Sequence, residues 1–189
     1  MIFLVLGLIV FLGVHSLSIV ARPWREATVA RLGEGPFKGM YSLASLAGFL
    51  LIIYGFGLAR QQPVVLYSPP AALRHLALVV MLPVFPLLFA AYLPGRIQRA
   101  ARHPMLAAVK FWALAHLLAN GTLADLLLFG GFLAWAVADR ISVKSRPAKV
   151  YAQGSARNDV IAVVLGLVVY ALFVLWAHAK LFGVSPLPG

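Results

Sequence analysis

Five histidines are the side chains of this chain best suited to chemistry, because cysteine is absent and acidic residues are scarce. His15 and His116 lie within long apolar runs, whereas His75 and His178 lie near the ends of two others. Ionisable side chains inside membrane helices are costly, so His15 and His116 each invite a functional hypothesis. Two histidines from different helices can hold a b-type haem without covalent attachment, since neutral imidazole is a good axial ligand. The simpler alternative is a histidine that hydrogen-bonds to a neighbouring helix.

The expected depths of the histidines leave two possible pairs. His116 follows Pro104 by 12 residues, which places it roughly 18 Å from the inner end of its helix. His15 precedes Arg22 by 7 residues, which places it about 10 Å from the same side. A tilted helix or a tilted macrocycle can absorb this difference, so His15 with His116 is the first choice of axial pair. His15 with His103 is the alternative, with His103 just before its helix begins.

Three further residues are candidates for contacts with such a cofactor. Lys110 is expected about 10 Å inside the fourth helix, where it either snorkels to headgroups or neutralises an anionic group such as a haem propionate. Arg102, with Arg99, is expected near the same face and could share that role. Asn120 shares a helical face with His116.

Composition excludes several other classes of function. The absence of cysteine rules out disulfides, cysteine-ligated clusters and covalent haem attachment, and five acidic residues argue against paired-carboxylate catalysis. The net charge of +11 would indicate nucleic-acid binding in a soluble protein. However, the chain is 62% hydrophobic and 11% charged, and the charges lie between apolar runs. We therefore expect the lipid bilayer as the partner, with anionic headgroups beside the basic loops, and no nucleic acid.

The apolar runs predict an all-α, polytopic membrane protein. A spanning helix needs about 20 mostly apolar residues, and six stretches meet or approach this length, at 2–21, 39–58, 73–92, 105–119, 123–138 and 160–182. The sequence thus predicts one domain over 1–189, a six-helix transmembrane bundle.

Local signals refine this six-helix bundle. Asn120-Gly121-Thr122 predicts a tight hairpin between the fourth and fifth helices, with Thr122 and Asp125 forming a capping box. Prolines inside the third run predict a kink. Two dipeptides are expected at helix ends, Asp139-Arg140 at the end of the fifth and Asn158-Asp159 as the cap of the sixth.

Lysine and arginine predict the orientation. The first, third and fifth loops hold twelve such residues, whereas the second and fourth hold two. Basic loops stay in the cytoplasm. We therefore expect a multi-pass protein of the bacterial inner membrane with both termini in the periplasm.

The block from Arg102-His103-Pro104-Met105 to the run Lys110-x-Trp112-Ala113-Leu114-Ala115-His116 and on to Asn120-Gly121 resembles the NnrU family. The likeness covers most of residues 1–140, and the 15-cis-zeta-carotene isomerases form a related branch. In that branch a b-type haem is held by one histidine in the first helix and one in the fourth. The resemblance therefore implies His15 and His116 as haem ligands. In the isomerases, a cysteine three residues before the second histidine can replace this histidine as a ligand. The corresponding residue here is Ala113, which cannot bind iron, so the resemblance favours electron transfer over isomerisation.

The resemblance also implies a role in nitrite and nitric oxide metabolism, because the family takes its name from denitrification gene clusters. The expected function is a bis-histidine haem protein in electron transfer or in cis–trans isomerisation of a hydrophobic substrate. One alternative is a non-enzymatic assembly or regulatory protein for denitrification. A minor alternative is methyl transfer from S-adenosylmethionine, because the Arg102-His103-Pro104 turn resembles that of the isoprenylcysteine carboxyl methyltransferases.

Overall fold

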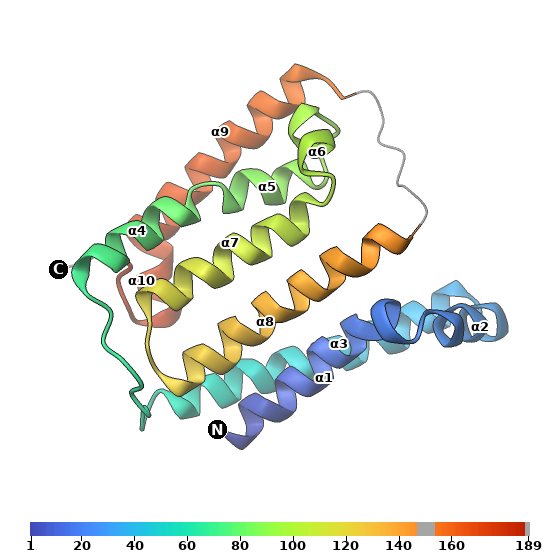
Figure 1. The fold of residues 1–189 in the computed structure, drawn as a ribbon, viewed down its shortest axis with the longest axis horizontal. Coiled ribbons are helices and arrows are strands. Elements are labelled where there is room, and N and C mark those ends of the chain that lie inside the picture. Colours follow the sequence, from blue (N-terminus) through green and yellow to red (C-terminus); the bar gives the residue numbers. More distant parts are fainter. Residues whose placement is uncertain (147–153, 188–189) are drawn as a thin grey trace.

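The computed structural model describes residues 1–146 and 154–187, and its regular elements there are helices. Figure 1 shows the longer helices side by side, with α8 between α1 and α7 and with α9 at the far edge. In this row α3 packs on α1, and α4 and α5 pack on α7. The helices of the row are α1 (Ile2–Val20), α3 (Glu34–Ala59), α8 (Leu123–Ser142), α7 (Pro104–Ala119), α4 (Ala71–Met81), α5 (Val84–Ala90) and α9 (Ala156–Leu172).

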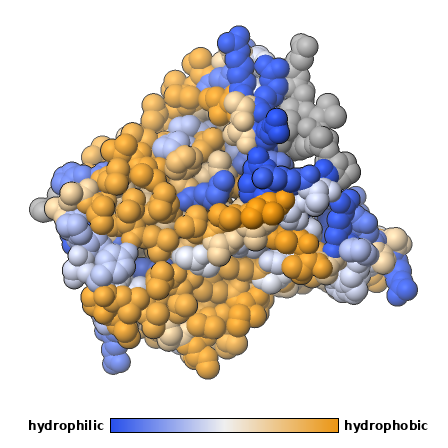
Figure 2. All heavy atoms as spheres, viewed as in Figure 1, coloured by the Kyte–Doolittle hydropathy of each residue, from blue (hydrophilic) through white to orange (hydrophobic). Residues whose placement is uncertain are grey.

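Five segments of the described structure are long and apolar enough to cross a membrane, which supports a polytopic membrane protein. They correspond to five of the six predicted spans. The remaining one, α7, has 16 residues, so it is about 24 Å long against roughly 30 Å of hydrocarbon. Large apolar side chains are exposed along the helices (Figure 2), as expected for surfaces that face lipid.

The predicted first loop was wrong in its local structure. Residues 22–38 were expected to be a basic loop, but Arg22–Leu32 forms helix α2, and α3 begins at Glu34 rather than at residue 39. Helix α2 has no buried residue, and its Arg25 guanidinium lies 5.5 Å from the centre of the Phe37 ring. Polar composition therefore marked a surface helix here and not an irregular segment.

The predicted kink in the third run is confirmed. Helix α4 ends at Met81 and α5 begins at Val84, on either side of Leu82 and Pro83. Proline has no N–H to donate and clashes with the preceding turn, so a continuous helix cannot pass through this position unbroken.

The predicted helix ends near residues 139 and 158 were wrong. Helix α8 continues to Ser142, and its Asp139 instead binds the Arg146 guanidinium at 2.7 Å. The sixth run begins at Ala156 with Ser155 as its N-cap. Asp159 instead accepts hydrogen bonds from the first backbone N–H groups of α6 (Arg96–Ala101), a short helix in the third loop.

The hairpin between α7 and α8 is confirmed. Thr122 accepts a hydrogen bond from the backbone N–H of Asp125, and the Asp125 carboxylate accepts one from the backbone N–H of Thr122 at 3.1 Å. The loop before α4 covers this turn, because Leu66 N donates to Gly121 O at 2.9 Å. The fourth loop is therefore tied to the second at one end of the bundle.

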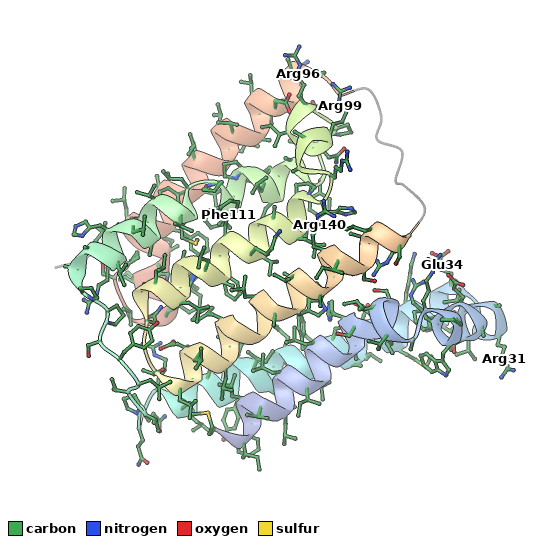
Figure 3. The ribbon with its side chains drawn as sticks, viewed as in Figure 1. Arg31, Glu34, Arg96, Arg99, Phe111 and Arg140 are labelled. Atoms are coloured by element: carbon green, nitrogen blue, oxygen red, sulfur yellow. The ribbon has the colours of Figure 1, made fainter. Side chains whose placement is uncertain are left out.

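Charged side chains gather at the opposite end of the bundle. Figure 3 shows that end with four labelled arginines, namely Arg31, Arg96, Arg99 and Arg140. The same grouping appears as hydrophilic surface in Figure 2. The uneven distribution of charge from which the orientation was predicted is thus present in the structure. Which end of the bundle faces the cytoplasm stays a prediction.

Candidate functional site

His116 lies three residues before the end of α7 and is enclosed by aromatic rings. Its ring stacks on Phe129 with 4.5 Å between centroids, and Trp112 lies 5.3 Å away. The Nδ1 atom is 2.8 Å from the carbonyl oxygen of Trp112. A carbonyl can only accept, so Nδ1 carries the hydrogen, and Nε2 of the neutral ring keeps a lone pair. His116 can therefore act as a ligand or as a hydrogen-bond acceptor through Nε2.

His178 is the histidine that faces His116. The two ring centroids are 6.5 Å apart and the planes are inclined by 28°. His178 opens α10 (His178–Phe182), and its ring lies 5.0 Å from that of Phe182. His178 was not among the predicted site residues, because it lies near the end of its apolar run, at 160–182.

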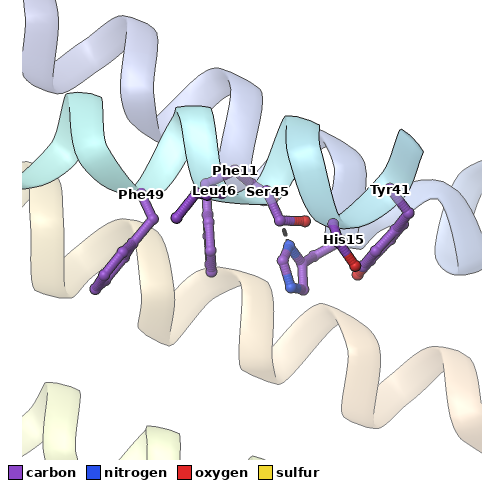
Figure 4. Close-up of a pocket in the computed structure, with 7 residues that line it drawn as sticks. Phe11, His15, Tyr41, Ser45, Leu46 and Phe49 are labelled. Atoms are coloured by element: carbon purple, nitrogen blue, oxygen red, sulfur yellow. Dashed lines mark hydrogen bonds between the residues drawn. The ribbon is translucent and has the colours of Figure 1, made fainter. Parts of the chain in front are cut away.

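His15 lies in a different place, on the wall of an open hollow of about 300 Å³ between α1 and α3 (Figure 4). Its Nδ1 is 2.7 Å from the Phe11 carbonyl oxygen, and its ring stacks on Phe11 at 4.2 Å. Tyr41 and Trp135 lie 5.3 and 5.9 Å from the ring. Among the described residues, the buried Oγ of Ser45, which lines the hollow, has no hydrogen-bond partner, and neither has the buried Nε1 of Trp135 beside His15. The hollow therefore combines aromatic walls with one hydroxyl group whose hydrogen bonding is not satisfied.

Aromatic rings of α8 lie between these two histidine centres. The Phe132 centroid is 5.6 Å from Phe11 of α1 and 5.5 Å from Trp112 of α7. The ring contacts of His15 are to Phe11, Tyr41 and Trp135, and those of His116 include His178. The described structure thus connects the two centres through packed rings and does not bring the two imidazoles into contact. Their pairing on one iron stays a prediction.

The remaining predicted site residues lie along α7 and before it. Arg102 and His103 precede the first residue of α7, about 20 Å along the axis from His116. Lys110 lies six residues inside α7, about 9 Å along the axis from His116. Arg102 has φ 57°, a left-handed value that is uncommon for residues other than glycine. Asn120 directly follows the last residue of α7, and its amide donates to the His116 carbonyl oxygen at 2.9 Å. Only Asn120 among these four therefore lies beside His116.

The described residues contain no group of three or more histidine, aspartate or glutamate side chains that could hold a metal ion. Most protein metal sites use at least three such side chains. The two facing histidines are therefore unsuited to a bare zinc, calcium or magnesium ion. A metal that brings its own additional ligands, as haem iron does, needs only two.

The profile of one protein family, described as NnrU protein, matches residues 3–186. No curated protein and no solved structure matches the chain. The match extends beyond the block around His116 and includes α9 and α10, where the resemblance in the sequence had faded. Because it spans nearly the whole chain, this protein belongs to the NnrU family.

Proposed function

We propose that this NnrU-family membrane protein binds a b-type haem, with His116 as one axial ligand, and that the haem serves electron transfer in nitrogen-oxide metabolism. The observation that carries the proposal is the hydrogen bonding of the His116 ring. Its Nδ1 is fixed on the Trp112 carbonyl, which leaves the Nε2 lone pair available in an aromatic, apolar surrounding. A ligating histidine usually donates its other ring nitrogen in this manner.

The donor set at His116 fits the chemistry of haem iron. Imidazole is a common axial ligand, and hydrophobic surroundings with few water molecules tune the reduction potential of the bound iron. When bound, the haem would supply one-electron chemistry at this position. The protein would contribute the ligand, its fixed ring orientation and an aromatic enclosure.

Electron transfer is favoured over isomerisation because of Ala113. This residue replaces the cysteine of the isomerase branch, and it is fully buried in the core at 0% exposure. Alanine has no atom that can exchange with a histidine on the iron. An iron with two fixed histidines has no open position for a substrate, so it is better suited to carrying electrons.

The absorption spectrum of the purified protein tests this function. Full-length protein from haem-replete cells should show a Soret band, and the His116→Ala variant should lose the band or shift it. His75→Ala is a matched control, since His75 makes the same local bond, with Nδ1 2.8 Å from the Ala71 carbonyl oxygen, but is exposed. A colourless wild-type protein, even after titration with hemin, would refute the proposal.

A second candidate, a non-enzymatic assembly or regulatory role, is favoured by α2. This basic helix has no buried residue, so its charged face is free to contact a partner protein. Reversing the charges of Arg22, Arg25 and Arg31 should then abolish nitrite and nitric oxide reduction in cells, while His116→Ala should leave it intact. The opposite pattern would support the haem protein.

Methyl transfer remains a minor candidate because of the strained backbone at Arg102. Unusual φ values often lie at functional sites. Isothermal titration with S-adenosylmethionine tests it, and absence of heat would reject it.

A further inference from the structure

The chain is irregular just where it positions His178. Helix α9 ends at Leu172, and residues Phe173–Ala177 form a π-helical turn before α10 begins at His178. A π-helical turn takes one residue more than an α-helical turn, so each residue that follows is rotated by about 100° around the axis. Such turns are rare and occur frequently at functional sites. The direction of the His178 side chain therefore depends on this π-helical turn, which interrupts the regular α-helix.

The segment that follows α10 also contacts the side chain of His178. Gly183 ends the helix in a left-handed conformation with φ 70°, and the chain turns back after it. As a result the Val184 carbonyl oxygen lies 2.7 Å from His178 Nδ1. In addition, the Arg60 guanidinium donates to the Phe182 carbonyl oxygen at 2.9 Å, which ties this end of α10 to the end of α3.

The hydrogen bond between His178 Nδ1 and the Val184 carbonyl oxygen distinguishes His178 from the histidines that lie inside helices. His15, His75 and His116 each place Nδ1 on the carbonyl four residues earlier in the same helix. His178 instead uses a carbonyl beyond the end of its own helix. Since the carbonyl only accepts, Nε2 of the neutral His178 ring keeps its lone pair, as in His116.

The separation of the two rings matches a shared metal. Metal–imidazole bonds are about 2 Å long, so two imidazoles on opposite sides of one ion have ring centres roughly 6 Å apart. The observed centroid separation of His116 and His178 is 6.5 Å. The separation therefore leaves room for one ion between the two rings.

We propose that His178, rather than His15, is the second axial ligand of the haem iron bound by His116. This proposal rests on the proposed function. It places the cofactor between α7 and α10, with Phe129 and Phe182 beside the two ligands. His15 then belongs to the separate hollow between α1 and α3, with the rings of Phe132 and Trp112 between it and the iron.

The test compares single variants of the full-length protein in detergent, each titrated with hemin and studied by absorption and electron paramagnetic resonance. The wild type, His15→Ala and the control His75→Ala should show the low-spin signature of two imidazole ligands. His178→Gly should lose that signature and become high-spin or fail to retain haem. Free imidazole added to His178→Gly should restore the low-spin spectrum, which a purely structural role of His178 would not produce.

The outcomes separate the two proposals. If His178→Gly stays low-spin, or if His15→Ala is the variant that loses the signature, His178 is not the ligand while haem binding stands. If the wild type takes up no haem at all, both proposals fail. Should His178→Gly not fold, His178→Met keeps a bulky side chain that can bind iron, and its expected change to a histidine–methionine spectrum tests the same point. An unchanged bis-imidazole spectrum in His178→Met overturns the assignment.

Discussion

Replacing Gly7 by alanine tests whether the close approach of α1 to α3 stabilises the amino-terminal half of the bundle. A Cβ atom at Gly7 would lie 2.6 Å from Ile52 N and 2.9 Å from Gly48 O. Both are backbone atoms of α3, so no change of side-chain rotamer can relieve the clash. Ordinary contact begins near 3.4 Å, so the two helices must separate by about 0.8 Å, a gap that forfeits a quarter to a half of each dispersion contact.

Inserting one methyl group into a closely packed interface usually costs about 1–3 kcal/mol. Gly13→Ala is the matched control, because it lies in the same helix and its Cβ would meet nothing within 4 Å. Both variants gain the same intrinsic preference of alanine for helix, about 1 kcal/mol in water. The difference between the two therefore isolates the packing at Gly7, and we expect Gly7→Ala to be less stable than Gly13→Ala by about 1–3 kcal/mol.

Reversible unfolding in mixed micelles, driven by increasing sodium dodecyl sulfate and followed by circular dichroism, measures both variants against wild type. Gly48→Ala probes the same interface from α3, since its Cβ would lie 2.7 Å from Phe11 N, and it should behave like Gly7→Ala. If Gly7→Ala proved as stable as Gly13→Ala, the backbone contact between α1 and α3 would not exist in solution.

Three other measurements test separate parts of the structure. Asp159→Ala removes the acceptor that binds the N–H groups of Arg96 and Ile97 at 2.9 and 3.0 Å. It should lower the free energy of unfolding by about 1 kcal/mol and speed tryptic cleavage within α6. An unchanged cleavage rate would contradict the role of Asp159 as a cap. Thr122→Ala removes one half of the capping box with Asp125 and should lower the free energy of unfolding by about 1 kcal/mol, with Thr122→Ser restoring most of it. A carboxy-terminal alkaline phosphatase fusion should be active and a fluorescent-protein fusion dark, whereas a fluorescent fusion would place the carboxy terminus in the cytoplasm.

The spans could be predicted from the sequence because lipid imposes one simple condition on them. Every backbone N–H and C=O group must be satisfied within the bilayer, so long apolar runs become helices. The same reasoning cannot find the ends of helices in polar segments. Glu34 pairs with Lys38 four residues later at 2.7 Å, and this local pair lies inside the first turns of α3, where composition alone indicated a loop.

Contacts between distant segments were also beyond the sequence. Asp159 was expected to cap the helix in which it lies, because capping signals are local in sequence. In the structure it caps α6, more than 60 residues earlier. Likewise the facing of His178 toward His116 depends on the π-helical turn Phe173–Ala177. No residue preference in the sequence marks such a turn.

The short length of α7 affects the surroundings of His116. A helix of about 24 Å is shorter than the hydrocarbon thickness, so backbone beyond one of its ends lies in lipid, where irregular backbone is tolerated only if protein covers it. Two neighbours provide that cover. The Tyr67 hydroxyl donates to the Asn120 carbonyl oxygen at 2.7 Å and also contacts that of Leu117, and α10 brings His178 alongside. A histidine three residues from the end of its helix would otherwise be exposed there. Covered in this way, His116 lies in an apolar, aromatic setting although it is close to the end of its helix, and such a setting is the one in which a ligand can hold an iron and keep water from it.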